Sequence, residues 1–129
     1  MTDRELLEAA AKAAGLPLGY GDGEYFWCQH GPFGESMYGR RGHAPLNWNP
    51  LADDGDALRL AVKLGFDMML YSDVKGVFHG DTGQQFAEDA RNSDPAAAVR
   101  RAIVRAAAAL AETRARADEA ALVVARGRP

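Results

Sequence analysis

Apolar positions recur at helical spacing in three segments of the chain. These segments are residues 2–14, a short stretch that starts after Asp53 or Asp54 and ends at Gly65, and a long stretch that starts at Asp94-Pro95. Thr2 and Glu5 have the spacing of a capping box, and Gly15 is placed to end the first helix. Proline is favoured at the first helical position, and the apolar repeat after Pro95 predicts a helix of about 25 to 30 residues.

Other stretches are rich in aromatic or β-branched residues and are bounded by glycine-containing turns, a pattern typical of strands. They are residues 24–29, 37–41, 66–71 and 77–79. Residues 85–90 fit a third strand of this meander or a helical turn, so 83–92 stays open, with strand favoured. The connections after Phe66 are too short for crossovers, which predicts a mainly antiparallel sheet. The expected order is α-β-β-α-β-β-β-α in an α+β fold.

Length and composition set outer limits on the protein class. The chain has 129 residues, of which 47% are hydrophobic and 26% charged, and this predicts a single domain over 1–129 with its last few residues frayed. The only cysteine, Cys28, cannot form an internal disulfide. No apolar run approaches the roughly 20 residues that span a bilayer, and Asp3, Glu5 and Glu8 stand where a signal peptide needs positive charge. We therefore expect a cytoplasmic protein with no membrane association.

Charge is distributed unevenly along the chain. Residues 1–90 hold 7 Lys/Arg and 14 Asp/Glu, whereas residues 91–129 hold 8 Arg and 4 acidic residues. The basic segment faces an anion, an acidic partner or the chain's own acidic part, and the last of these is the favoured interpretation. An acidic chain without a continuous basic stripe argues against duplex DNA as a ligand.

Catalytic motifs are not found in the sequence. Phosphate-binding loops, zinc-protease motifs and Ser-nucleophile elbows are missing, and the three histidines lack ligand spacing. Asp53, Asp54 and Asp56 offer carboxylates to a divalent metal, which makes a small metal-dependent hydrolase one alternative, but acids at a helix start are better explained as caps. We predict no catalytic residue, no metal and no cofactor.

Two groups of residues are candidates for ligand binding. The aromatic segment followed by Arg40 and Arg41 combines stacking surfaces with guanidinium groups, which hold bases and phosphates. The second group is Arg100, Arg101 and Arg105 near the start of the last helix. The candidate ligand-binding residues are Tyr25, Trp27, Arg40, Arg41, Trp48, Arg101 and Arg105. Arg101 and Arg105 lie one helical turn apart. The alternative for the first group is a packed aromatic sheet face with a solvated basic turn. The alternative for the second group is pairing of Arg100, Arg101 and Arg105 with Asp53, Asp54 and Asp56.

Two segments resemble a known family. They are the run from Trp48 through Asn49-Pro50-Leu51-Ala52-Asp53-Asp54-Gly55-Asp56 to Leu64, and the run from Asp94-Pro95 to Ala107. Together with an N-terminal Glu-Leu-Leu-Glu-Ala-Ala helix, they are similar to the small bacteriophage and prophage proteins of the phage ABA sandwich domain. The resemblance implies a three-layer α/β/α sandwich in which Trp48 and Leu51 pack the helix start and Leu58, Val62 and Leu64 fill the core.

No catalytic residue follows from the resemblance. It favours a phage-encoded, non-enzymatic accessory protein of the host cytoplasm that acts by binding, as an anti-defence or host-takeover factor. The expected partner is a host protein or a small anionic signalling nucleotide. A structural module forming a homodimer through its Ala-rich last helix is the other class.

Overall fold

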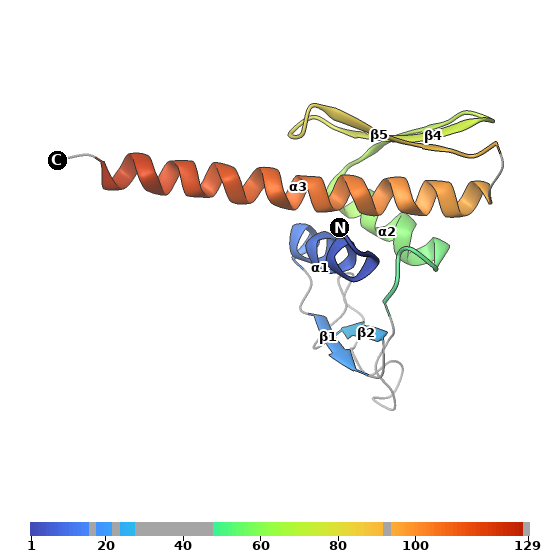
Figure 1. Ribbon diagram of the computed structural model, residues 1–129, viewed down its shortest axis with the longest axis horizontal. Coiled ribbons are helices and arrows are strands. Elements are labelled where there is room, and N and C mark those ends of the chain that lie inside the picture. The colour runs from blue at the N-terminus through green and yellow to red at the C-terminus, as the bar shows by residue number, and fades with distance from the viewer. Residues whose placement is uncertain (16–17, 22–23, 28–47, 92–93, 128–129) are drawn as a thin grey trace.

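The computed structural model describes residues 1–15, 18–21, 24–27, 48–91 and 94–127. Along the chain, the elements are α1 (Asp3–Ala14), β1 (Leu18–Gly21), β2 (Glu24–Trp27), α2 (Asp54–Leu64), β3 (Asp67–Leu70), β4 (Val74–His79), β5 (Gln84–Asp89) and α3 (Pro95–Arg126). The α+β class is confirmed (Figure 1).

Local side chains and glycines set the ends of the helices, as the sequence predicts. Thr2 accepts a hydrogen bond from the backbone N–H of Glu5 at the start of α1. Asp53 accepts from the N–H of Asp56 at 2.8 Å, so it is the cap of α2. Gly65 has a φ of 71°, a left-handed conformation that glycine adopts without steric cost, and α2 ends there.

β3, β4 and β5 form an antiparallel sheet. Met68 pairs with Val77, and Val77 pairs with Phe86, so these three side chains form one row across the sheet face toward α3. Residues 83–92, for which the sequence left strand or helix open, thus contain the strand β5. Phe66 packs edge-on against His79, with ring centroids 5.7 Å apart, which fixes the chain where it enters β3.

α3 is the central layer of the molecule (Figure 1). The sheet packs on one side of α3, while α1 and α2 pack against α3 on the side away from β4 and β5. Ala102, Ala106 and Ala107 are almost fully buried, and their small side chains let both layers come close to the helix. The expected arrangement, with helices on both faces of the sheet, is not confirmed, because the described helices all lie on one face.

The aromatic segment begins differently from the prediction. Residues 18–21 were not predicted to be a strand, but they form β1, which pairs antiparallel with β2. The strand predicted at 24–29 is found over Glu24–Trp27, and residues 28–29 and the strand predicted at 37–41 lie outside the described residues.

The core face of α2 is also displaced from the expected one. Leu64 is buried as expected, but Leu58 is 54% exposed and Val62 is 69% exposed, so the prediction that these two residues fill the core is wrong. The buried positions are Ala57, Leu60, Ala61 and Leu64, with Asp56. The reason is that α2 packs against α3 and α1, which places the face of Leu60 and Ala61 inward. Within the described ranges, no helix combines the length and apolar character needed to cross a membrane.

Candidate functional site

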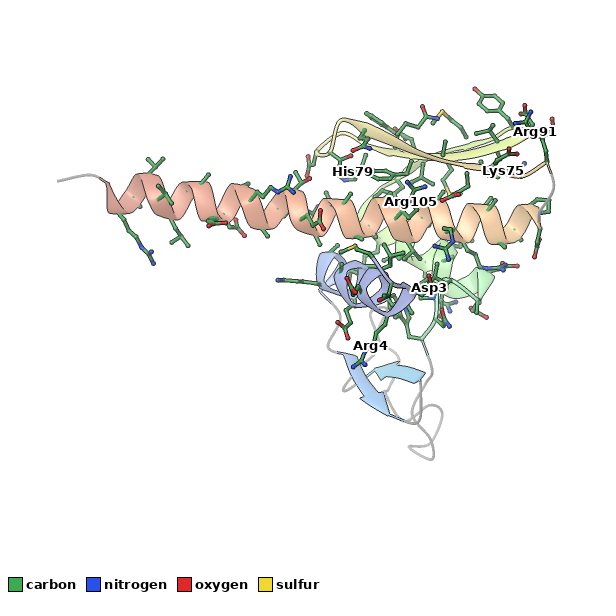
Figure 2. All side chains as sticks on the ribbon, in the orientation of Figure 1. Asp3, Arg4, Lys75, His79, Arg91 and Arg105 are labelled. Carbon is green, nitrogen blue, oxygen red and sulfur yellow. The ribbon has the colours of Figure 1, made fainter. Side chains whose placement is uncertain are left out.

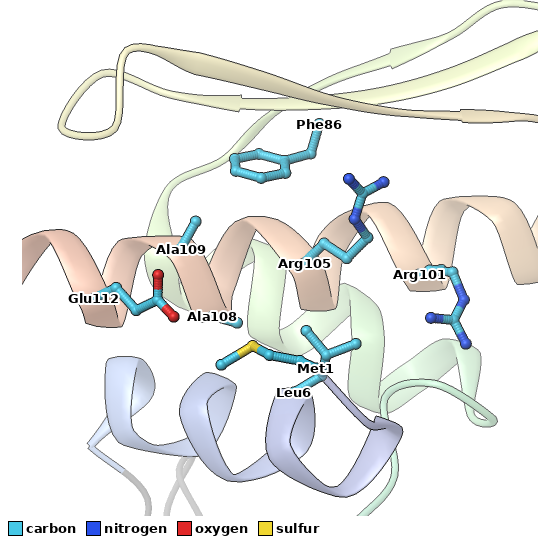
Figure 3. A pocket seen from close by; sticks show the side chains of 8 residues that line it. All are labelled: Met1, Leu6, Phe86, Arg101, Arg105, Ala108, Ala109 and Glu112. Carbon is cyan, nitrogen blue, oxygen red and sulfur yellow. The ribbon is translucent and has the colours of Figure 1, made fainter.

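Arg101 and Arg105 line the same hollow, a groove of about 330 Å³ between α1, α3 and β5 (Figure 3). We call it the arginine groove. Its walls are formed by Met1, Leu6, Phe86, Arg101, Arg105, Ala108, Ala109 and Glu112. The alanines on α3 keep the groove open beside the two long guanidinium side chains, because they fill little space.

Arg105 is placed by the sheet. Its guanidinium group contacts the carboxylate of Glu88 at 2.5 Å and lies 5.7 Å from the centroid of the Phe86 ring. Figure 2 shows Arg105 in the space between α3 and the strands. Phe86 and Glu88 are two residues apart on β5, so they face the same side of the sheet, toward α3. Arg105 thus combines a charge pair with a cation–π contact.

Arg101 is placed by the start of α1. Its guanidinium group donates to the carboxylate of Asp3 at 3.0 Å. The Arg101 and Asp3 side chains are 43% and 64% exposed, so water screens this pair strongly. Asp3 also lies in the first turn of α1, where its negative charge interacts favourably with the positive end of the helix dipole.

The basic C-terminal segment pairs with the acidic part of the chain, as the favoured interpretation predicts. Arg100 contacts Asp54 at 2.5 Å, and Arg114 lies 3.8 Å from Asp81. The predicted pairing of Arg100, Arg101 and Arg105 with Asp53, Asp54 and Asp56 is found in part. Arg100 pairs with Asp54, whereas Arg101 and Arg105 pair with Asp3 and Glu88.

The three aspartates have separate structural tasks. Asp53 caps α2, and Asp54 pairs with Arg100. Asp56 is buried and accepts hydrogen bonds from the N–H of Asn49 at 3.0 Å and from Arg59 at 2.7 Å. Among the described residues, no three His, Cys, Asp or Glu side chains are grouped so that they could hold a metal ion.

Trp48 belongs to the core, with 2% of its surface exposed. The prediction that it stacks on a ligand is wrong for this reason, while its role in packing the start of α2 agrees with the structure. Leu51 packs against the same core cluster.

The other predicted aromatic residues do not lie at the arginine groove. Tyr25 and Trp27 are in β2, and the hairpin of β1 and β2 lies on the side of α1 that faces away from the sheet (Figure 1). Arg40 and Arg41 fall outside the described residues. Among the predicted residues that the structure describes, Arg101 and Arg105 come together in the arginine groove.

Sequence reasoning missed most of the other groove residues. Phe86, Glu112 and Met1 come from a strand, a helix and the chain start, and no local motif links positions so far apart. The helical spacing of Arg101, Arg105 and Glu112 was the one available signal, because residues that are four and seven positions apart lie close to one face of a helix.

A second cavity of about 240 Å³ lies between α2, α3 and β3. Its apolar walls include Leu58, Met68 and Ile103. The ion pair of Arg100 and Asp54 stands at the same cavity. Leu58, unexpectedly exposed on α2, is thus part of a hollow apolar surface.

Comparison with known proteins finds no matching family model, no similar curated protein and no similar solved structure. The likeness to the phage ABA sandwich domain therefore stays a prediction that rests on the quoted residues.

Proposed function

We propose that this protein is a phage-encoded, non-enzymatic binding protein of the host cytoplasm that holds a small anionic ligand in the arginine groove. The observation that carries the proposal is the placement of Arg101 and Arg105 in one groove beside Phe86. Guanidinium groups bind phosphate oxygens in pairs of parallel hydrogen bonds. The groove volume of about 330 Å³ falls within the range of small-molecule sites.

The groove has opposite charges at its two ends, which favours a nucleotide over a simple anion. Arg101 and Glu112 are eleven residues apart on α3, about 16 Å along a helix, and Arg105 lies between them (Figure 3). Phosphate groups would occupy the arginine end, and the Glu112 carboxylate would accept a hydrogen bond from an amino group of a base. The ring of Phe86 supplies an apolar wall between them.

The carboxylates that already contact the arginines do not prevent ligand binding. Exposed ion pairs contribute only about 0 to 1 kcal/mol, so a ligand with several negative charges can replace Asp3 at Arg101. Arginine also has five N–H donors in a fixed fork, so Arg105 can keep its contact with Glu88 while it donates to phosphate.

The test is calorimetric titration with nucleoside monophosphates, diphosphates, triphosphates and cyclic dinucleotides, after native mass spectrometry of the purified protein. Arg101→Ala and Arg105→Ala should each weaken binding of the ligand found by about tenfold or more, since charge-assisted hydrogen bonds contribute about 1.5 to 3 kcal/mol. Arg126→Ala, at the far end of α3, is the matched control. An unchanged affinity in the Arg101→Ala/Arg105→Ala double variant would contradict the proposal.

Binding of a host protein is the second candidate, and the cavity at Leu58 favours it. An apolar side chain of a partner protein would fill this hollow as an interface anchor. Leu58→Arg should then abolish capture of one defined host protein from infected cells, while Val62→Arg, one turn away on α2, should retain it. Absence of any protein whose capture depends on Leu58 would remove this candidate.

A further inference from the structure

The two arginines of the arginine groove point in different directions. Figure 3 shows Arg105 leaving α3 toward the strands, whereas Arg101 leaves it toward α1. Their partners agree with this view, because Arg105 contacts Glu88 of β5. Arg101 donates to Asp3 of α1. The two residues are four positions apart, about 6 Å along a helix axis, and their guanidinium groups face opposite walls of the groove.

Arg105 is held more firmly than Arg101. Its partner, the Glu88 carboxylate, is 24% exposed. The guanidinium group of Arg105 also lies over the ring of Phe86 and donates to the carbonyl oxygen of Ala87 at 3.5 Å. Arg101 instead pairs with a carboxylate of α1 that is 64% exposed, and such pairs are weak because water replaces either partner at little cost. Arg101 is therefore the arginine of this groove that can change its partner.

We propose that Asp3 is a latch that holds Arg101 away from the ligand position in the free protein. Binding of a phosphate-containing ligand moves the guanidinium group of Arg101 from Asp3 to the ligand, where it joins Arg105. The inference rests on the proposed function of the arginine groove and adds a regulatory contact to it. Asp3 lowers the ligand affinity of the groove, because the ligand must break an existing charge pair before it gains Arg101.

The helix α1 keeps its structure when the latch opens. Thr2, and not Asp3, accepts the hydrogen bond from the backbone N–H of Glu5 that caps this helix. The released carboxylate stays in the first turn, where it still interacts favourably with the positive end of the helix dipole. Leu6 and Leu7 are buried, so the core holds α1 in place. The exchange is thus confined to one side chain of α1 and one of α3.

Calorimetric titration with pyrophosphate, a probe with two linked phosphate groups, tests the latch. Asp3→Asn removes the charge and keeps the size of the side chain. It should raise pyrophosphate affinity about two- to fivefold at low salt, the factor that corresponds to an exposed ion pair. Glu5→Gln removes a charge from the same first turn and is the matched control. Its affinity should change by less than about 1.5-fold, since water and salt screen this charge.

The gain in affinity must depend on Arg101. In an Arg101→Ala background, Asp3→Asn should leave pyrophosphate affinity unchanged, because the latch has nothing to hold. An equal gain in both backgrounds would reveal a general effect of charge and would overturn the proposal. The same conclusion would follow if Asp3→Asn alone had no effect, or if pyrophosphate bound to neither the wild type nor Asp3→Asn. Nucleotide titration of the Arg101→Ala/Arg105→Ala variant decides the proposed function separately, so the two failures are distinguishable.

Carboxyl NMR follows the exchange of partners directly. Addition of pyrophosphate should shift the carboxyl carbon signal of Asp3, which loses its guanidinium partner. The corresponding signal of Glu88 should stay close to its position, since Arg105 keeps this contact. A shift at Glu88 with none at Asp3 would contradict the proposal, because Arg105 would then be the side chain that moves.

Discussion

Asp56 is the carboxylate on which the start of α2 depends most directly. It is buried and satisfies both the N–H of Asn49 and the guanidinium group of Arg59. Asp54, by contrast, is well exposed and pairs only with Arg100 among the contacts described. Identical residue types two positions apart therefore have different energetic weight, because burial removes the water that would replace a lost partner.

Asp56→Ala should lower the free energy of unfolding by about 1 to 3 kcal/mol, since it leaves buried donors without a partner. Asp54→Ala should cost less, about 1 kcal/mol, because the Asp54 carboxylate is exposed and Arg100 keeps its hydrogen bond to the carbonyl oxygen of Leu51. Urea unfolding followed by tryptophan fluorescence measures both values. Equal losses in the two variants would show that Asp56 is not buried as described.

Asp89 carries a pH-dependent contribution at the end of β5. The side chain of Arg91 donates to its carboxylate, and the Arg91 backbone N–H donates as well, so the pKa of Asp89 lies below its ordinary value of 3.8. A lowered pKa in the folded state gives stability that is present above the unfolded pKa and is lost as pH falls through the folded one. Arg91→Ala should raise the pKa of Asp89 in a carboxyl NMR titration, and an unchanged value would contradict the pairing.

Individual residues could be predicted from sequence where the cause is local. Thr2, Asp53 and Gly65 act within one helical turn of themselves, so their spacing reveals their roles. The burial of Trp48 and the partners of Arg101 depend on residues far away in the chain. Spacing in one sequence holds no information on such contacts, which is why Trp48 was also assigned to a ligand site and the partners of Arg101 were left open.

Among the elements, α3 lies between the sheet on one side and α1 and α2 on the other. Its Ala-rich first half is buried against the sheet on one side and α1 on the other. Helical period predicted this helix and its start, but not that both sides would be covered. For α2, too, the helical period predicted the helix but not its buried face. Packing against α3 and α1 determines which face of α2 is buried.

Close packing at α3 makes its alanines sensitive to size. Ala107 is fully buried, and Ala107→Leu should cost about 1 to 3 kcal/mol of unfolding free energy, because overpacking displaces neighbouring layers. Ala117→Leu makes the same change at an exposed position of the same helix. It should alter stability by less than about 0.5 kcal/mol. Thermal and urea unfolding of both variants test the difference, and a neutral Ala107→Leu would mean that the layers are not in close contact.

Across the whole molecule, arginines of α3 connect it to the acidic part of the chain. Arg100, Arg101 and Arg105 reach Asp54, Asp3 and Glu88, which lie at three separate places around the helix. Arginines of the basic C-terminal segment thus pair with carboxylates from the acidic part of the chain. Composition predicted this outcome, although it gave no information on the individual pairs.

The strength of these pairs decides whether a ligand can compete for the arginine groove. A double-mutant cycle of Asp3→Ala and Arg101→Ala should give a coupling free energy below about 1 kcal/mol, because both side chains are exposed. The coupling should decrease further in high salt, where exposed charges are screened. The corresponding cycle for Glu88 and Arg105 should give a larger value, since Glu88 is only 24% exposed.

Urea unfolding of the single and double variants at low and high salt measures both couplings. A coupling at Arg101 of several kcal/mol that persists in high salt would mean that Asp3 holds the guanidinium group too firmly for an anion to displace it. Ligand binding through Arg101 would then be excluded. A weak, salt-sensitive coupling would leave the Arg101 end of the groove free to exchange an internal carboxylate for a phosphate, with Arg105 held in place by Glu88 and Phe86.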